Sequence, residues 1–167
     1  MSLRTLVALL AAFGALVAPA CGGDETPAGQ ATAVKALDGL TVPATLLDLA
    51  VQAEDVSVVE GTKRPYVDAV GLYSLRSQDL LQATLQISRF TKDSKATTSK
   101  FRNSVVTQIG STTPRIFRVG EQPVWLTTGR RQSVAVWWDG YYLFVLSSRD
   151  DYATPRALLR AAIEVKP

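Results

Sequence analysis

The chain has 167 residues, of which 47% are hydrophobic and 20% are charged, with one Cys, no His and a formal net charge of +3. This composition excludes collagen-like, disulfide-framework and wholly disordered proteins, and the length leaves room for one globular domain. Because there is no His and only one Cys, zinc-finger-type metal cages and imidazole acid/base catalysis are also excluded. We expect neither a bound metal nor a cofactor.

The N-terminus has the pattern of a secretory signal peptide. Arg4 supplies a positive charge, residues 6–18 are apolar or small, and Pro19 and Ala20 lead to Cys21. The apolar run is shorter than the roughly 20 residues that a membrane-spanning helix needs. We therefore predict that residues 1–20 are a cleaved signal peptide.

Residues 18–23, Ala-Pro-Ala-Cys-Gly-Gly, resemble the lipobox of bacterial lipoproteins, in which small residues precede an invariant Cys. In that family the Cys thiol receives a diacylglyceryl group and becomes the new N-terminus. The resemblance implies that Cys21 anchors the mature protein on the extracytoplasmic face of the cell membrane, where two acyl chains bind firmly. A plain secretory signal is the alternative, and it would leave Cys21 as an unpaired thiol. The amino-acid usage also resembles that of lipoproteins from high-GC Gram-positive bacteria.

The mature chain divides into a tether and a domain. Residues 21–36 combine the lipidated Cys with a stretch rich in Gly, Ala, Thr and acidic residues that lacks apolar periodicity, which predicts a flexible tether. Residues 37–167 follow as a single globular domain. No internal repeat indicates a solenoid or a propeller.

The first half of the domain predicts one helix and two strands. Residues 41–55 place Leu side chains at helical spacing after Pro43, which predicts a helix. Residues 66–75 and 80–90 predict a hairpin around the polar segment 76–79. In the second of these strands apolar and polar residues alternate, as in a sheet with one buried face.

A second helix is predicted at residues 93–109. This segment is polar except for Phe101, Val105 and Ile109, which lie four residues apart on one helical stripe, and Gly110 follows as a stop signal. An apolar stripe of this kind is expected to cover a sheet.

Further strands are predicted at residues 115–119, 124–128, 132–138 and 141–148. The last two bracket Asp139-Gly140, a strong hairpin signal because a type I′ turn needs positive φ at both central residues. A closing amphipathic helix starts near Pro155. The order of elements predicts an α+β fold, an antiparallel sheet of about five to six strands with about two to three helices packed on it. Its general appearance resembles small secreted α+β sandwiches of the PsbP-like fold.

The aromatic end of the last hairpin is a candidate site. A two-residue turn there pairs Trp138 with Tyr141 and Trp137 with Tyr142, and both faces of the hairpin are apolar. In one interpretation helices cover both faces, so these rings belong to the core. In the other, Trp137, Trp138, Tyr141 and Tyr142 line a pocket for a lipid tail or a glycan, or contact a partner.

Charge is distributed unevenly along the mature chain. Residues 22–84 contain four Lys or Arg and nine Asp or Glu, whereas residues 85–167 contain thirteen and six. This asymmetry favours an envelope protein or an anionic polymer as partner, with no nucleic acid, unless the charges mix on the folded surface. Arg130 and Arg131 are the densest local pair of cations.

No recognisable catalytic motif occurs in the sequence. It contains no nucleophile elbow, dinucleotide loop or Walker-type loop. Asp150 and Asp151 suit a helix N-terminus better than an acid/base pair, because neighbours in an extended chain point in different directions. We therefore expect that the protein is not an enzyme.

These features predict a membrane-anchored extracytoplasmic lipoprotein that acts as a binding or interaction module of the cell envelope. One alternative is a carrier or sensor of an apolar, lipid-like small molecule, which requires a cavity of roughly 300 Å³ or more beside Trp137 or Trp138. Another is a hydrolase of envelope polymers, which requires a raised pKa at Asp150 or Asp151 in a cleft.

Replacing Cys21 with Ser should abolish membrane anchoring, because a serine hydroxyl does not take the thioether-linked diacylglyceryl group. We expect the wild type to enter the detergent phase in a detergent phase separation and Cys21→Ser to stay in the aqueous phase. A Ser2→Ala control should behave like the wild type. Equal partitioning of all three proteins would contradict the lipobox assignment.

Overall fold

The computed structural model describes residues 34–37, 40–58, 66–110, 112–129, 131–153 and 155–167. The predicted signal peptide, Cys21 and most of the predicted tether lie outside the described residues, as does Arg130.

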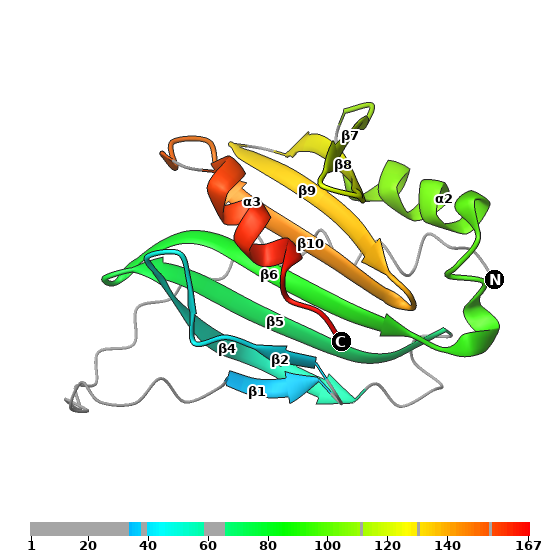
Figure 1. Ribbon diagram of the computed structural model, residues 1–167, viewed down its shortest axis with the longest axis horizontal. Coiled ribbons are helices and arrows are strands. Elements are labelled where there is room, and N and C mark those ends of the chain that lie inside the picture. Colours follow the sequence, from blue (N-terminus) through cyan, green and yellow to red (C-terminus); the bar gives the residue numbers. More distant parts are fainter. Residues whose placement is uncertain (1–33, 38–39, 59–65, 111, 130, 154) are drawn as a thin grey trace.

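The described chain is built of strands with two α-helices and one short 3₁₀-helix (Figure 1). In chain order these are β1 (Val34–Leu37), β2 (Leu40–Val42), β3 (Thr45–Leu46), β4 (Leu49–Val58), β5 (Val67–Ser77), β6 (Leu80–Phe90), η2 (Lys92–Ser94), α2 (Ser99–Ile109), β7 (Arg115–Val119), β8 (Gln122–Gly129), β9 (Gln132–Asp139), β10 (Tyr142–Arg149) and α3 (Pro155–Ile163). An eight-stranded antiparallel sheet has the order β3-β4-β5-β6-β10-β9-β8-β7, and β1 pairs with β2 in a separate two-stranded sheet.

The predicted α+β fold is confirmed, but the predicted number of strands is too low and the helix predicted at residues 41–55 is wrong. That segment contains the end of β2, all of β3 and most of β4. Leu46 and Leu49 are both buried and form a cross-strand pair around the turn at Leu47, which has φ of 56°. Two residues that flank a two-residue turn are three apart in sequence. Their spacing therefore imitates one turn of a helix.

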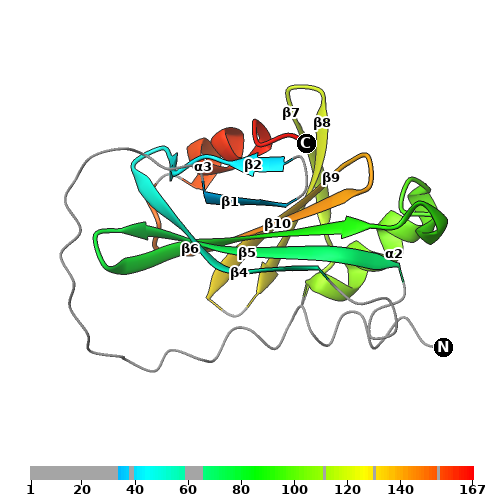
Figure 2. The ribbon, with the colours of Figure 1, turned by 90° about the horizontal axis from the view of Figure 1, so that it is seen from below.

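Both faces of the sheet are buried, so the molecule has two cores. Figure 2 shows β1, β2 and α3 on one side of the sheet and α2 on the other. The first core joins side chains of β1, β2 and α3 to alternate residues of the strands, and its largest members are Trp137, Tyr73 and Phe144. The second core packs Val105 and Val106 of α2 against the opposite face. Burial on both faces follows from the continuous apolar character of β9 and β10.

The β5–β6 hairpin agrees with the prediction, and its strands are joined by the turn between Ser77 and Leu80. The β9–β10 hairpin is also present, but its predicted register is wrong. Trp138 pairs with Leu143 rather than with Tyr141, and Asp139 pairs with Tyr142.

The turn of the β9–β10 hairpin is Gly140-Tyr141 instead of Asp139-Gly140. Gly140 has φ of 52°, whereas Tyr141 is not among the residues with positive φ, which excludes a type I′ turn. The register is displaced by two residues. A displacement of two leaves every side chain on its predicted face.

The predicted second helix is shorter than expected, since residues 92–94 form η2 and the helix itself begins at Ser99. Thr98 caps it, because its Oγ1 accepts a hydrogen bond from the Phe101 backbone N–H. The helix ends before Gly110, as predicted, but Gly110 has φ of −95° and needs no glycine for its backbone angles. A β-carbon at this position would collide with the Thr127 side chain. Glycine is therefore required here by close packing between the end of α2 and β8.

Replacing Gly110 with Ala should lower the free energy of unfolding by about 1–3 kcal/mol, the usual effect of overpacking, as measured by urea denaturation. If the collision is the cause, Thr127→Ala in the Gly110→Ala background should recover part of that loss, since it removes the colliding atoms. Strictly additive effects of the two substitutions would show that Gly110 acts for another reason.

Candidate functional site

Neither α-helix among the described residues covers the β7–β8 end of the sheet on the face that α3 occupies. Eight strands at about 4.8 Å spacing make a sheet roughly 34 Å wide, whereas a helix with its side chains is only about 10 Å across. On the first face α3 contacts β10 and β3, and β1 contacts β4 and β5. The end of this face that is formed by β9, β8 and β7 therefore lies beside α3 instead of beneath it (Figure 1).

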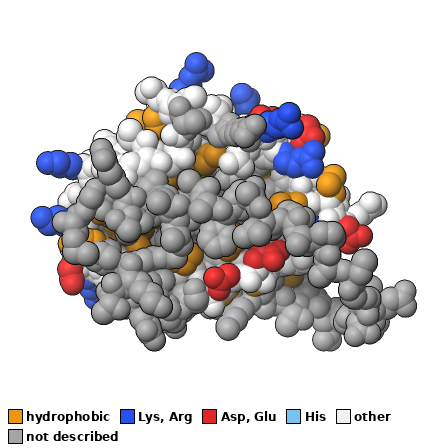
Figure 3. Space-filling model, turned by 180° about the vertical axis from the view of Figure 1, so that it is seen from behind, with side chains coloured by type: hydrophobic (Ala, Val, Ile, Leu, Met, Phe, Trp, Pro, Cys, Tyr) orange, Lys and Arg blue, Asp and Glu red, His pale blue; other side chains and the backbone are white. Residues whose placement is uncertain are grey.

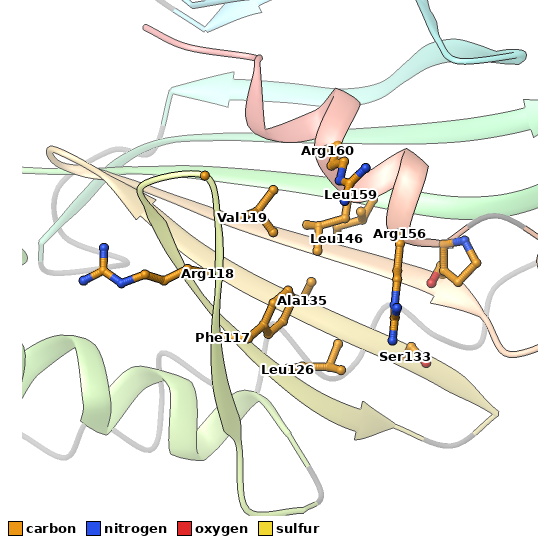
Figure 4. Close-up of a pocket in the computed structure, with 13 residues that line it drawn as sticks. Phe117, Arg118, Val119, Leu126, Ser133, Ala135, Leu146, Arg156, Leu159 and Arg160 are labelled. Atoms are coloured by element: carbon orange, nitrogen blue, oxygen red, sulfur yellow. The ribbon is translucent and has the colours of Figure 1, made fainter.

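A pocket of about 540 Å³ lies in this uncovered region, between α3 and the β7–β8 hairpin (Figure 4). Ala135 and Leu146 form its apolar floor, and Leu159 of α3 forms one wall. The lining residues are Phe117, Arg118, Val119, Gly120, Leu126, Ser133, Ala135, Leu146, Ser148, Pro155, Arg156, Leu159 and Arg160.

The register of the strands directs apolar side chains into this pocket. Phe117 lies opposite Val124 and Leu126 lies opposite Ala135, so these residues share the face that α3 occupies. Phe117 is 37% exposed and Leu126 is 38% exposed. Large apolar side chains that line a hollow and remain this exposed would gain free energy from an apolar occupant.

The charged side chains at the pocket are arginines. Arg156 and Arg160 lie one helical turn apart on α3, and both line the pocket. The side chain of Arg118 instead extends away from the pocket in Figure 4, and its Nη1 donates a hydrogen bond to the Glu121 carbonyl oxygen at 3.0 Å. None of the lining residues is acidic.

Acidic residues nearby are engaged by other partners. Ser133, at the pocket, donates a hydrogen bond to Asp150 at 3.4 Å. Arg149 holds Asp151 through two hydrogen bonds of 2.6 and 2.8 Å. The hydrogen bond from Arg149 is the main cause that lowers the pKa of the Asp151 carboxyl, and a hydrolytic general acid would need the opposite shift.

The structure does not bring the four aromatic residues of the β9–β10 hairpin together around one pocket. Trp137 and Trp138 are 1% and 3% exposed and point to opposite faces of the sheet. Trp137 stacks on Phe144 with ring centroids 5.2 Å apart. Tyr141 and Tyr142 are half-buried at the edges of the two cores. The pocket lies beside Ala135 and Leu146 of the same hairpin, and neither Trp lines it.

Trp138 lies in a cluster of two aromatic rings and one arginine. Phe90 and Phe101 pack against its indole at centroid distances of 5.3 and 6.1 Å, and the Arg102 guanidinium lies 5.3 Å from its ring centroid. Arg102 also donates hydrogen bonds to the carbonyl oxygens of Ala96 and Gly140, at 2.7 and 2.8 Å. Burial is the main cause that lowers the pKa of Arg102. This cluster fixes α2 to the turn of the β9–β10 hairpin.

The predicted pair of cations is only partly visible. Arg131 is exposed in the turn between β8 and β9, where it has φ of 59°, and Arg130 lies outside the described residues. On the face seen in Figure 3, Lys and Arg side chains lie in the upper part and along the left edge, and Asp and Glu side chains lie both beside them and in the lower part.

The sequence analysis missed the residues that line the pocket. Phe117 and Leu126 lie in short strands whose pattern does not reveal that α3 stops short of them. Arg156 and Arg160 are spaced by four residues on a predicted helix, which signals a shared face but not what lies opposite that face.

Within the described ranges, no group of three or more Cys, Asp or Glu residues lies together to hold a metal ion. Neither α-helix in the described part of the chain is long and apolar enough to cross a membrane.

Comparisons with known proteins assign no family to this chain. No family model and no curated protein matches the sequence. A solved structure that is similar is that of a GTP-binding regulator from Thermotoga maritima, with 12% identity and a TM-score of 0.39 over 69% of this chain and 76% of that one. A likeness this weak supports no inference about function.

The burial of Trp137 and Trp138 can be checked by fluorescence in a Trp125→Phe variant, which retains only these two indoles. Because both are buried, we expect blue-shifted emission and quenching by acrylamide at least about fivefold weaker than that of free tryptophan. Quenching should rise to the level of an exposed indole in urea. Strong quenching of the native variant would show that at least one of the two indoles is accessible to solvent, and it would contradict their burial.

Proposed function

We propose that this protein is a membrane-tethered extracytoplasmic binding module whose domain takes an apolar small molecule, or the apolar part of a larger one, in the pocket between α3 and the β7–β8 hairpin. The observation that carries this proposal is the pocket itself. Its volume of about 540 Å³ falls within the range of roughly 300–1,000 Å³ that is usual for small-molecule sites.

The chemistry of the walls supports an apolar occupant. Phe117, Val119, Leu126 and Leu159 surround a floor of Ala135 and Leu146. The polar groups of the lining belong to serines and arginines, as in sites where a few polar groups orient a largely apolar ligand. The proposed site differs from the aromatic hairpin suggested by the sequence, because it uses the outer part of the same sheet face.

The lipobox-like sequence supports the membrane location. A diacylglyceryl group on Cys21 would hold the domain at the membrane through the part of the predicted tether that precedes β1, near lipids and other apolar envelope components. The partner class that follows is a small apolar or amphipathic molecule of the envelope.

An interaction module for another envelope protein is the second candidate. It is favoured by β7, which forms one edge of the sheet and whose residue Ile116 is 65% exposed. An edge strand can pair with an extended segment of a partner. This function would require β7 and would not require the pocket to be open.

Filling the pocket should separate the two candidates. The probe is phenylnaphthylamine, an uncharged dye that fluoresces in apolar sites, titrated into the soluble Cys21→Ser protein without residues 1–20. We expect Leu126→Trp to weaken dye binding at least about tenfold, because the larger side chain occupies the pocket. Leu80→Trp, at a 54% exposed position at the start of β6, is the matched control and should bind like the parent. Absence of saturable binding to the parent protein would contradict the proposal.

A further inference from the structure

Most arginines in the described part of the chain have partners. Arg89 is paired with Asp68 at 2.7 Å and Arg149 with Asp151 at 2.6 Å. Arg76, Arg102 and Arg118 donate hydrogen bonds to backbone carbonyl oxygens. Hydrogen bonds and ion pairs therefore account for Arg76, Arg89, Arg102 and Arg149, which do not line the pocket. They also account for Arg118, which lines the pocket but extends away from it in Figure 4.

Two of the described arginines whose guanidinium groups have no hydrogen-bond or ion-pair partner line the pocket. The described arginines without such a partner are Arg115, Arg131, Arg156 and Arg160. Arg156 and Arg160 line the pocket from α3, and Arg115 lies on β7 opposite Leu126, a pocket residue. Arg131 lies in the turn that joins β8 to β9, which precedes the pocket residue Ser133. Two of these four guanidinium groups thus belong to residues that line the apolar pocket.

The two arginines on α3 both line the pocket. Positions four apart share a helix face, and in Figure 4 Arg156 extends towards Ser133 while Arg160 lies beside Leu159. A guanidinium presents several N–H donors in a plane and matches the oxygens of carboxylate and phosphate groups. Asp151 is occupied by Arg149, and Asp150 accepts a hydrogen bond from Ser133, so neither acid is seen paired with these two arginines.

We infer that the ligand of this pocket is an amphipathic anion, whose apolar part lies against Phe117 and Leu126 and whose anionic head is bound by Arg156 and Arg160. The inference rests on the proposed function, since it names the chemical class of the ligand in the same pocket. The shared chemistry is a carboxylate or phosphate joined to an apolar chain. A fatty acid and a single-chain phospholipid both have it.

Two dyes with the same aromatic skeleton test this inference. Phenylnaphthylamine is uncharged, and anilinonaphthalene sulfonate is the same molecule with one anionic group. The soluble Cys21→Ser protein without residues 1–20 should bind the sulfonate about tenfold more tightly, which is the contribution of roughly one charge-assisted hydrogen bond. The double variant Arg156→Gln/Arg160→Gln should lose this preference and keep its affinity for the neutral dye.

A control double variant removes the same charge away from the pocket. Lys100 on α2 and Lys166 after α3 are exposed and are not pocket residues. Lys100→Gln/Lys166→Gln should keep the preference for the sulfonate. A loss of preference as large as that of the arginine variant would mean that overall charge, rather than the two arginines, selects the anion, and this would overturn the inference.

The other outcomes are also distinct. Equal binding of both dyes to the parent protein would overturn the inference and leave the proposed function standing. Binding of neither dye would remove the proposed function itself. Competition then identifies the head group: displacement of the sulfonate dye by palmitate alone supports a carboxylate, and displacement by lysophosphatidylglycerol alone supports a phosphodiester. Displacement by inorganic phosphate at the same concentration would overturn the role of the apolar chain.

Discussion

The need to cover a wide sheet whose two faces are both apolar shapes this whole molecule. The central strands β9 and β10 bury side chains on both faces, with Trp137 and Phe144 in one core and Trp138 and Leu143 in the other. Neither face can be left in water without a large loss of hydrophobic stabilisation. The described part of the chain meets this need with two short α-helices and the β1–β2 pair, with α3 and β1–β2 on one face and α2 on the other.

The pocket is the consequence of incomplete cover. The nine residues of α3 reach across β10 towards β3, and β1 with β2 lies over the other end of the same face, so the outer strands β7 and β8 are left beside the helix. The resulting hollow has apolar walls because the residues around it belong to the same alternating pattern as the core. Arginines border it instead of acids, which gives the site both of the properties that an amphipathic anion requires.

Local packing explains three features that the sequence pattern predicted incorrectly or for a different reason. The helical spacing of Leu46 and Leu49 came from a tight turn, since cross-strand neighbours on either side of two turn residues are also three apart. The turn of the β9–β10 hairpin is Gly140-Tyr141 and not the predicted Asp139-Gly140. Each side chain still lies on its predicted face, because the observed register differs from the predicted one by two residues. Gly110 follows α2 as expected, but glycine is required there by the closeness of the Thr127 side chain and not by its backbone angles. The first two differences each arise within a single tight turn, and the third arises from a side chain that is distant in sequence.

The sequence by itself determined the α+β class, the antiparallel hairpins, the helix stripe around Val105 and the double-sided apolar character of the last hairpin, because each of these depends on residue periodicity within one segment. Only the tertiary structure decided the eight-stranded order, the burial of Trp137 and Trp138 on opposite faces, and the pocket. The residues of that pocket come from β7, β8, β9, β10 and α3, and their common property is a position that α3 fails to cover. Such a position depends on the length and placement of a helix relative to distant strands, which no pattern within a single segment records.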